Sequence, residues 1–138
     1  MNSSMGIFFL RVSLGLSMFL GHGLGKLQRF EAIYTRFPDP IGLGSPFSLL
    51  LVVFAEAFCS MLVVLGLGTR LALIPLIITM GVACFIFHMD DPFSGKEKSF
   101  LYLIGFISLF LSGSGKWTVQ NRFLSSTKNR YLNWLLER

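Results

Sequence analysis

Four apolar stretches, separated by short polar segments, dominate this sequence of 138 residues. They run over residues 5–26, 46–67, 70–88 and 97–113. A bilayer core about 30 Å thick needs roughly 17–25 helical residues, and a segment within lipid must be helical because lipid cannot hydrogen-bond its peptide groups. The first three stretches reach this length easily and the fourth only marginally. The sequence therefore predicts an all-α polytopic membrane protein that forms a four-helix transmembrane bundle. The lipid bilayer is its predicted partner.

The composition excludes several other classes of protein. Only 14% of the residues are charged and 53% are hydrophobic, whereas a soluble domain carries about 25% charged residues. The net charge of +5 is compatible with nucleic-acid binding, but the basic residues lie at the edges of the apolar stretches, as they do in membrane proteins. We therefore expect no nucleic-acid partner. The first stretch lacks a basic segment before Gly6 and a small-residue cleavage site, so we expect it to remain in the mature protein.

The chain divides into two parts. Residues 1–116 hold the predicted four-helix transmembrane domain, and residues 117–138 form a basic tail. Trp134 and Leu135 follow Tyr131 in this tail at spacings of three and four residues, on one side of a helix, and Trp and Tyr favour the headgroup layer. The pattern predicts an amphipathic helix that lies on the membrane surface. A disordered basic tail is the alternative.

The distribution of Lys and Arg predicts the orientation of the chain. Four spans place both termini on one side of the membrane, and the cytoplasmic side carries the excess of basic residues. The side of the termini holds Arg70, Lys116, Arg122, Lys128, Arg130 and Arg138. The opposite side holds Lys26, Arg29, Arg36, Lys96 and Lys98. Because the tail places its basic residues close behind the fourth stretch, the sequence predicts that both termini are cytoplasmic (N-in, C-in).

Several ionisable residues lie within or beside the apolar stretches. The candidate ligand-binding or pocket residues are Arg11, His22, Lys26, Glu56, His88 and Glu97. Such groups are costly in a membrane and usually face the bundle interior or a cavity. With a rise of about 1.5 Å per residue, Arg11 and Glu56 are the deepest, and the others lie at or near the outer surface. The sequence thus predicts a polar pocket that opens outward, with an Arg11–Glu56 pair at its base and the two imidazoles near its mouth.

The segment FLGHGLGKL, residues 19–27, contains two of these candidates. Its glycines are expected to let neighbouring helices approach closely. His22 and Lys26 are four residues apart and share a helix face, on the same stripe as Arg11. We expect His22 to exchange protons near neutral pH and Lys26 to offer a positive charge to a ligand. The alternative is structural: the polar residues hold helices together or mark helix ends, and Arg11 extends to the inner surface.

No residue can be assigned a catalytic role from the sequence, which shows no P-loop, dinucleotide-binding or nucleophile motif. Whether the protein is an enzyme is therefore left open. A metal site built from His22, Glu56, His88 and the two cysteines would draw its ligands from different helices, without a local motif such as Cys-x-x-Cys. We expect no metal site.

Longer motifs accompany these residues between Arg11 and Val119. They are LRVSLGLSMFLGHGLGKL, FPDPIGLGSPFSLLLVVFAEAFCSMLVVLGLGTRLA, FIFHMDDPF, EKSFLYLIGF and GSGKWTV. Together they resemble the DoxX family of four-helix bacterial membrane proteins. The matching positions are Arg11, His22, Gly23, Lys26, Glu56, Gly66, Thr69, Arg70, His88, Glu97, Gly113 and Gly115. Family members usually continue with Ser-Leu-Asp, where this chain has Thr118-Val119-Gln120, so no role of that aspartate is carried over.

The resemblance implies a multi-pass protein of the bacterial inner membrane with a link to quinone-dependent redox chemistry. The family is named after a subunit associated with a terminal quinol oxidase, and related proteins join thiosulfate:quinone oxidoreductases. Quinone is thus the implied cofactor, not covalently bound, and a membrane redox complex is the implied partner, in a homo- or hetero-oligomer. The leading hypothesis is a membrane partner or assembly factor of a larger system. The alternatives are a quinone-linked redox subunit, with its pocket open to the extracytoplasmic side, and a small-molecule or proton transporter.

Overall fold

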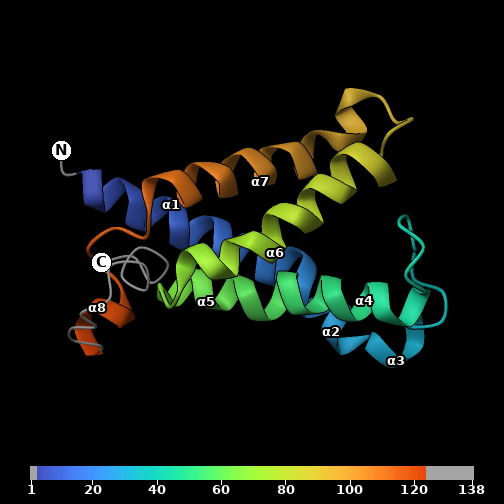
Figure 1. Ribbon diagram of the computed structural model, residues 1–138, viewed down its shortest axis with the longest axis horizontal. Helices are drawn as coiled ribbons and strands as arrows, with labels where there is room; N and C mark the ends of the chain where they lie inside the picture. Colours follow the sequence, from blue (N-terminus) through green and yellow to red (C-terminus); the bar gives the residue numbers. More distant parts are fainter. Residues whose placement is uncertain (1–2, 124–138) are drawn as a thin grey trace.

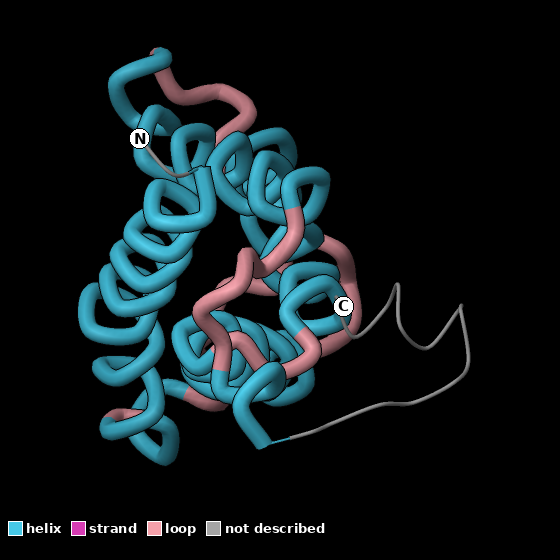
Figure 2. Tube along the Cα trace, turned by 90° about the vertical axis from the view of Figure 1, so that its left-hand side faces the viewer, coloured by secondary structure: helices cyan, strands magenta, loops and turns pink. Residues whose placement is uncertain are grey.

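Four long helices build the described part of the protein (Figure 1). The computed structural model describes residues 3–123, and within these residues every regular element is helical (Figure 2). The first long helix joins α1 (Ser3–Met18), the π-helical segment η1 (Phe19–Gly23) and α2 (Leu24–Gln28). The second joins α4 (Ser45–Val53), the π-helical segment η2 (Phe54–Cys59) and α5 (Ser60–Leu65). The third joins α6 (Thr69–Val82) and the π-helical segment η3 (Ala83–Phe87), and the fourth is α7 (Phe93–Ser112).

Three of these helices are long and apolar enough to cross a membrane: Ser3–Gln28, Ser45–Leu65 and Thr69–Phe87. The predicted fold class, an all-α polytopic membrane protein, is therefore confirmed. Two short helices, α3 (Phe30–Ile33) and α8 (Val119–Phe123), complete the described part of the chain. The amphipathic helix predicted around residue 134 lies outside the described residues.

The fourth long helix, α7, has 20 residues but is not among the described helices that satisfy the criteria for a span. It begins at Phe93, four residues before the predicted start, so Glu97 lies in its second turn and not in its first. The charges of Lys96, Glu97 and Lys98 leave an apolar length over residues 99–112 of about 21 Å. α7 packs along α6 and α1 and completes the bundle.

Each of the three membrane-spanning helices contains one of the π-helical segments. A π turn closes a hydrogen bond between residues i and i+5, and thus inserts an extra residue into the helix. The residues beyond the insertion are rotated relative to the regular period of 3.6. Such insertions are frequent at functional sites, and here η1 contains His22 while η2 contains Glu56.

The first two spanning helices approach each other closely at two glycines of the first. A Cβ at Gly15 would lie 2.6 Å from Val64 Cγ2, and a Cβ at Gly23 would overlap the backbone carbonyl of Glu56. The close approach predicted for the glycines of residues 19–27 is thus confirmed at Gly23. It does not extend to Gly21, where a Cβ would meet nothing within 4 Å.

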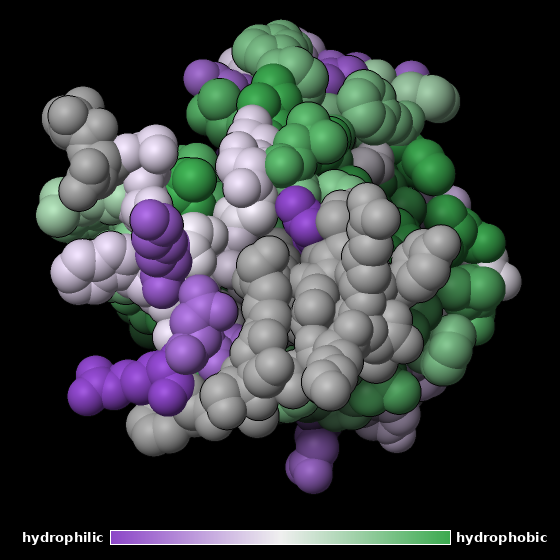
Figure 3. All heavy atoms as spheres, turned by 60° about the vertical axis from the view of Figure 1, so that its left-hand side comes forward, coloured by the Kyte–Doolittle hydropathy of each residue, from purple (hydrophilic) through white to green (hydrophobic). Residues whose placement is uncertain are grey.

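Buried side chains from all four long helices form the core. Its members are Met18, Ala55, Cys59, Val63, Ala72, Leu73, Leu76, Met80, Leu103, Phe106 and Leu109. Large apolar side chains also face outward, among them Phe9, Phe58 and Leu101. Figure 3 shows such side chains covering much of the described surface on the face drawn, while hydrophilic ones gather at its lower left. An apolar exterior of this extent fits contact with lipid, because a protein with such a surface would tend to aggregate in water.

The connection between α3 and α4 is held together by one carboxylate. Asp39 accepts hydrogen bonds from the backbone N–H groups of Leu43 (2.9 Å) and Gly44 (2.7 Å) and from the Ser48 hydroxyl (2.7 Å). The hydrogen bond from Ser48, followed by the one from Gly44, lowers the pKa of Asp39 below its usual value. The connection is thereby anchored to the first turn of α4, next to the pocket described below.

Candidate functional site

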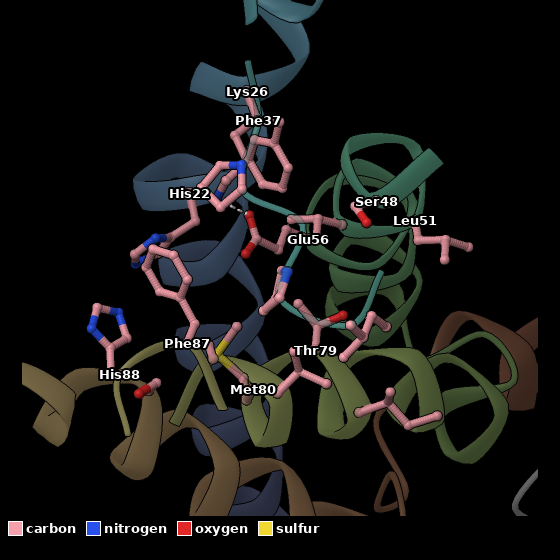
Figure 4. A pocket seen from close by; sticks show the side chains of 18 of the residues that line it. His22, Lys26, Phe37, Ser48, Leu51, Glu56, Thr79, Met80, Phe87 and His88 are labelled. Carbon is pink, nitrogen blue, oxygen red and sulfur yellow. Dashed lines mark hydrogen bonds and ion pairs between the residues drawn. The ribbon is translucent and has the colours of Figure 1, made fainter. Parts of the chain in front are cut away.

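A pocket of about 490 Å³ lies among the helices at the end of the molecule that carries α2, α3 and the α6–α7 connection (Figure 1). Figure 4 shows Glu56 at its centre, with His22 and Lys26 on one side, Leu51 on the other, and Thr79 and Met80 of α6 below. The pocket lies at the level of all three π-helical segments, since residues of η1, η2 and η3 line it.

The deepest polar feature of this pocket is an ion pair between Lys26 and Glu56. The Lys26 ammonium donates a hydrogen bond of 2.5 Å to Glu56 Oε2. The Glu56 side chain is 5% exposed and that of Lys26 is 23% exposed, so solvent screens the pair less than a surface pair. The close contact between Gly23 and the Glu56 backbone brings η1 against η2. Lys26 lies about one turn after Gly23, in α2, and its side chain reaches the Glu56 carboxylate from there.

The predicted Arg11–Glu56 pair is wrong. Arg11 is fully buried at the opposite end of the bundle, where its guanidinium donates to the carbonyls of Val63 (2.7 Å), Val64 (2.7 Å) and Trp117 (2.6 Å). Val63 is seven residues beyond Glu56, about 10 Å along the helix axis. Arg11 therefore binds the last turn of α5, where a cation also opposes the negative end of the helix dipole.

Arg11 also lines a second cavity, of about 500 Å³, that is separate from the Lys26–Glu56 pocket. The described residues around this cavity are Phe8, Arg11, Val64, Leu65, Lys116, Trp117, Thr118, Val119, Asn121 and Arg122. Arg11 thus does not form the base of the pocket that holds the other candidates, and its contacts are those of a residue that ties α1, α5 and the segment after α7 together.

His22 lines the Lys26–Glu56 pocket from η1. Its ring meets the ring of Tyr102 edge to face, with centroids 5.7 Å apart and planes at 90°. It forms no hydrogen bond with any described residue, so its ring nitrogens are available to a ligand. The sequence did not lead us to predict Tyr102, although a phenol hydroxyl within the apolar part of a long helix could have marked it as a candidate pocket residue.

His88 and Glu97 have different outcomes. His88 lines the pocket at its outer edge, where its Nδ1 lies 2.6 Å from a carboxylate oxygen of Asp91. Glu97 is exposed and does not line the pocket. Lys98 and Tyr102 do line it, and the Glu97 side chain lies on another face of α7. The structure therefore brings four of the six predicted residues together at the pocket: His22, Lys26, Glu56 and His88.

The remaining walls are mostly apolar. They come from the connection before α4 (Phe37, Pro38, Pro40, Ile41 and Leu43), from α4 (Leu51 and Val52) and from α6 and η3 (Ile78, Met80, Val82, Ala83 and Phe87).

No group of three or more metal-ligating side chains stands close together in the part of the chain that the structure describes. A largely apolar cavity with a few convergent polar groups is the usual form of a small-molecule site.

This geometry defines a helical membrane protein with a ligand-sized pocket set partly within its spanning helices. Residues 6–89 match the DoxX family model. An uncharacterized protein from Haemophilus influenzae is 31% identical over 122 residues, which cover 83% of this chain and 88% of the relative. The chain therefore belongs to the DoxX family, as its motifs had indicated. No solved structure is significantly similar to it.

Proposed function

We propose that this protein binds a quinone-type headgroup in the Lys26–Glu56 pocket and acts as a membrane partner of a quinone-dependent redox system. The observation that carries the proposal is the ion pair itself, which places a strong donor and a strong acceptor side by side in an apolar cavity. Polar groups in such a setting fix the orientation of a ligand, while the apolar walls supply contact area.

The pocket offers hydrogen bonds to both redox forms of such a ring. A quinone carbonyl accepts a hydrogen bond, which the Lys26 ammonium can donate. A quinol hydroxyl donates one, which Glu56 Oε1 can accept, since only Oε2 is bonded to Lys26. His22 holds a donor and an acceptor on opposite sides of a neutral ring and serves either form. Membership of the DoxX family, with its links to quinone-dependent enzymes, supports the same ligand class.

A paired substitution tests this proposal. Lys26→Met with Glu56→Gln removes both charges but keeps the shape of both side chains, and leaves no buried charge unpaired. We expect the protein to melt within a few degrees of wild type and the copurified quinone to fall about tenfold or more, because a hydrogen bond to a charged group is worth about 1.5–3 kcal/mol. Organic extraction of the purified protein followed by mass spectrometry measures the quinone.

Lys116→Met is the matched control, because Lys116 is exposed and lies at the opposite end of the bundle. Its quinone content should equal that of wild type. If wild-type protein carries no more quinone than the paired variant does, the pocket has no role in quinone binding and the proposal fails.

We further infer that the chain lies in the cell inner membrane as a multi-pass protein with both termini cytoplasmic. The support is the positive-inside rule applied to the sequence. The side of the termini carries six Lys and Arg residues (Arg70, Lys116, Arg122, Lys128, Arg130 and Arg138), the last five of them close behind α7, against five on the opposite side (Lys26, Arg29, Arg36, Lys96 and Lys98). In this orientation the Lys26–Glu56 pocket lies toward the extracytoplasmic side. A phosphatase reporter, active only outside the cytoplasm, should be inactive at either terminus and active when inserted at Gly42. The reverse pattern would show that both termini lie outside the cytoplasm and would contradict this orientation.

A further inference from the structure

The Lys26–Glu56 pocket has an apolar edge where α4 and α6 face each other. α6 packs against η2 and α5, and it separates from α4 toward the pocket end of the molecule (Figure 1). Leu51 of α4 and Ile78 of α6 line the two sides of this opening. Both are nevertheless well exposed, at 41% and 60% respectively, so the protein does not cover the pocket there.

The position of these residues along their helices sets the depth of the opening. Ile78 lies nine residues before the end of η3 at Phe87, which is about 14 Å along the helix. Leu51 lies six residues after the start of α4 at Ser45, about 9 Å. In a bilayer core about 30 Å thick, both side chains lie at hydrocarbon depth. The opening therefore faces lipid chains and not water.

The polar and apolar parts of the pocket are also segregated. Lys98 and His88 line it at the end where α7 begins, which is the membrane surface, and the Lys26–Glu56 pair follows. On the side where α4 and α6 separate, the lining turns to Leu51, Ile78 and other apolar side chains. These side chains lie no deeper than Glu56, which is eleven residues after Ser45, about 16 Å along its helix, so the apolar part lies beside the ion pair and not below it. A ligand that matches this arrangement has a hydrogen-bonding headgroup and an apolar chain attached to it.

We propose that the pocket receives its ligand sideways from the bilayer, with the headgroup against the Lys26–Glu56 pair and an apolar chain leaving between Leu51 and Ile78. The ligand class is a lipid-dissolved amphiphile with an uncharged hydrogen-bonding ring. This inference rests on the proposed function, because it concerns the same pocket, and it adds the route of entry and the need for a chain.

Cross-linking in lipid nanodiscs tests the route directly. The probe is a dimethoxy-methyl-benzoquinone with a decyl chain that carries a diazirine at its midpoint. We expect light to attach it to peptides of α4 or α6 at Leu51, Ile78 or Val82, and an excess of the unlabelled decyl-benzoquinone to suppress this attachment. Attachment to the connection around Phe37 and Leu43 would place the chain in the surface mouth instead and would overturn the inference.

A substitution at the opening provides the second test. Lipid chains are as apolar as the residues of the opening, so an alkyl chain gains little affinity there and only needs an unobstructed exit. Ile78→Trp should obstruct this exit. We expect it to weaken binding of the decyl form at least about tenfold more than binding of the benzoquinone without a chain, a difference of about 1.4 kcal/mol.

Ile74→Trp is the matched control, since Ile74 is exposed one turn earlier on α6 and does not line the pocket. It should bind both probes as wild type does. Because the probe without a chain reports on the headgroup site alone, its binding to Ile78→Trp shows that the variant is folded. Failure of wild type to bind either probe would refute the proposed function, whereas an equal effect of Ile78→Trp on the binding of both probes would refute only the sideways route.

Discussion

Replacing Gly23 with alanine is expected to destabilise the protein by about 3 kcal/mol or more and to abolish binding in the Lys26–Glu56 pocket. The added Cβ would overlap the backbone carbonyl of Glu56, and a backbone atom cannot move aside as the end of a flexible side chain can. Overpacking of a well-packed interior typically costs 1–3 kcal/mol even where side chains can adjust. The spanning helices would have to separate, and Glu56 would move away from Lys26. Thermal melting in detergent and quinone content measure the two effects.

Gly21→Ala is the matched control, because Gly21 lies in the same π-helical segment but its Cβ would meet nothing within 4 Å. Alanine is favoured over glycine inside a helix by roughly 0.5–1 kcal/mol, so this variant should be as stable as wild type or slightly more so. An equal loss of stability in both variants would mean that the π-helical segment tolerates no side chain at all, and that contact with Glu56 is not the cause.

The fold was predictable from the sequence because a bilayer restricts the available structures. Runs of apolar residues long enough to cross lipid must be helical, and the short polar segments between them set their order. Glycines mark the ends of two helices, at Gly66 and Gly113, where the backbone has positive φ values of 70° and 83°. The start of α7 was placed four residues too late because a helix beginning at the membrane surface needs no apolar residues in its first turns.

The candidate site was predictable in part for the same reason. His22, Lys26, Glu56 and His88 stand out because ionisable residues are rare in apolar helices, and the structure brings them to one pocket. The walls were not predictable. The residues contributed by the connection before α4 and by α6 have no polar signature, and their convergence depends on how the helices separate at that end.

The partner of Glu56 could not be found from helical periodicity. The stripe that joined Arg11 to His22 and Lys26 assumed a regular helix, but η1 inserts an extra residue between Arg11 and Lys26. The insertion rotates Lys26 relative to Arg11. Lys26 binds Glu56, whereas Arg11 binds the carbonyl of Val63, about 10 Å further along the second helix. Nothing in the residue types of FLGHG distinguishes a π-helical segment from an α-helical one, so the error lies in the geometry and not in the choice of residues.

Arg11→Met is expected to destabilise the protein by about 3 kcal/mol or more while the Lys26–Glu56 pocket keeps its ligand. Methionine retains part of the apolar stem but removes the donors to the carbonyls of Val63, Val64 and Trp117. The Val63 carbonyl keeps a hydrogen bond from the Gly66 backbone N–H (3.1 Å), but the part-buried carbonyls of Val64 and Trp117 lose this donor. A buried carbonyl left unsatisfied costs about 1–3 kcal/mol. Arg11→Lys should lose less, because an ammonium still donates, but it cannot reproduce the planar fork that serves several carbonyls at once. Melting temperature and quinone content together measure this separation of stability from binding.

A double variant distinguishes this role of Arg11 from a pair with Glu56. If the two residues formed an ion pair, Arg11→Gln would leave Glu56 as an unpaired buried charge, and adding Glu56→Gln would restore part of the lost stability. The structure predicts no recovery. Glu56 binds Lys26, and the carbonyl of Val63 that Arg11 binds lies about 10 Å along the helix from Glu56. Changes at that separation without a shared partner usually add to within about 0.5 kcal/mol. The stability lost by the double variant should therefore equal the sum of the losses of the two single variants. Any clear recovery of stability would mean that Arg11 pairs with Glu56 at the base of the pocket.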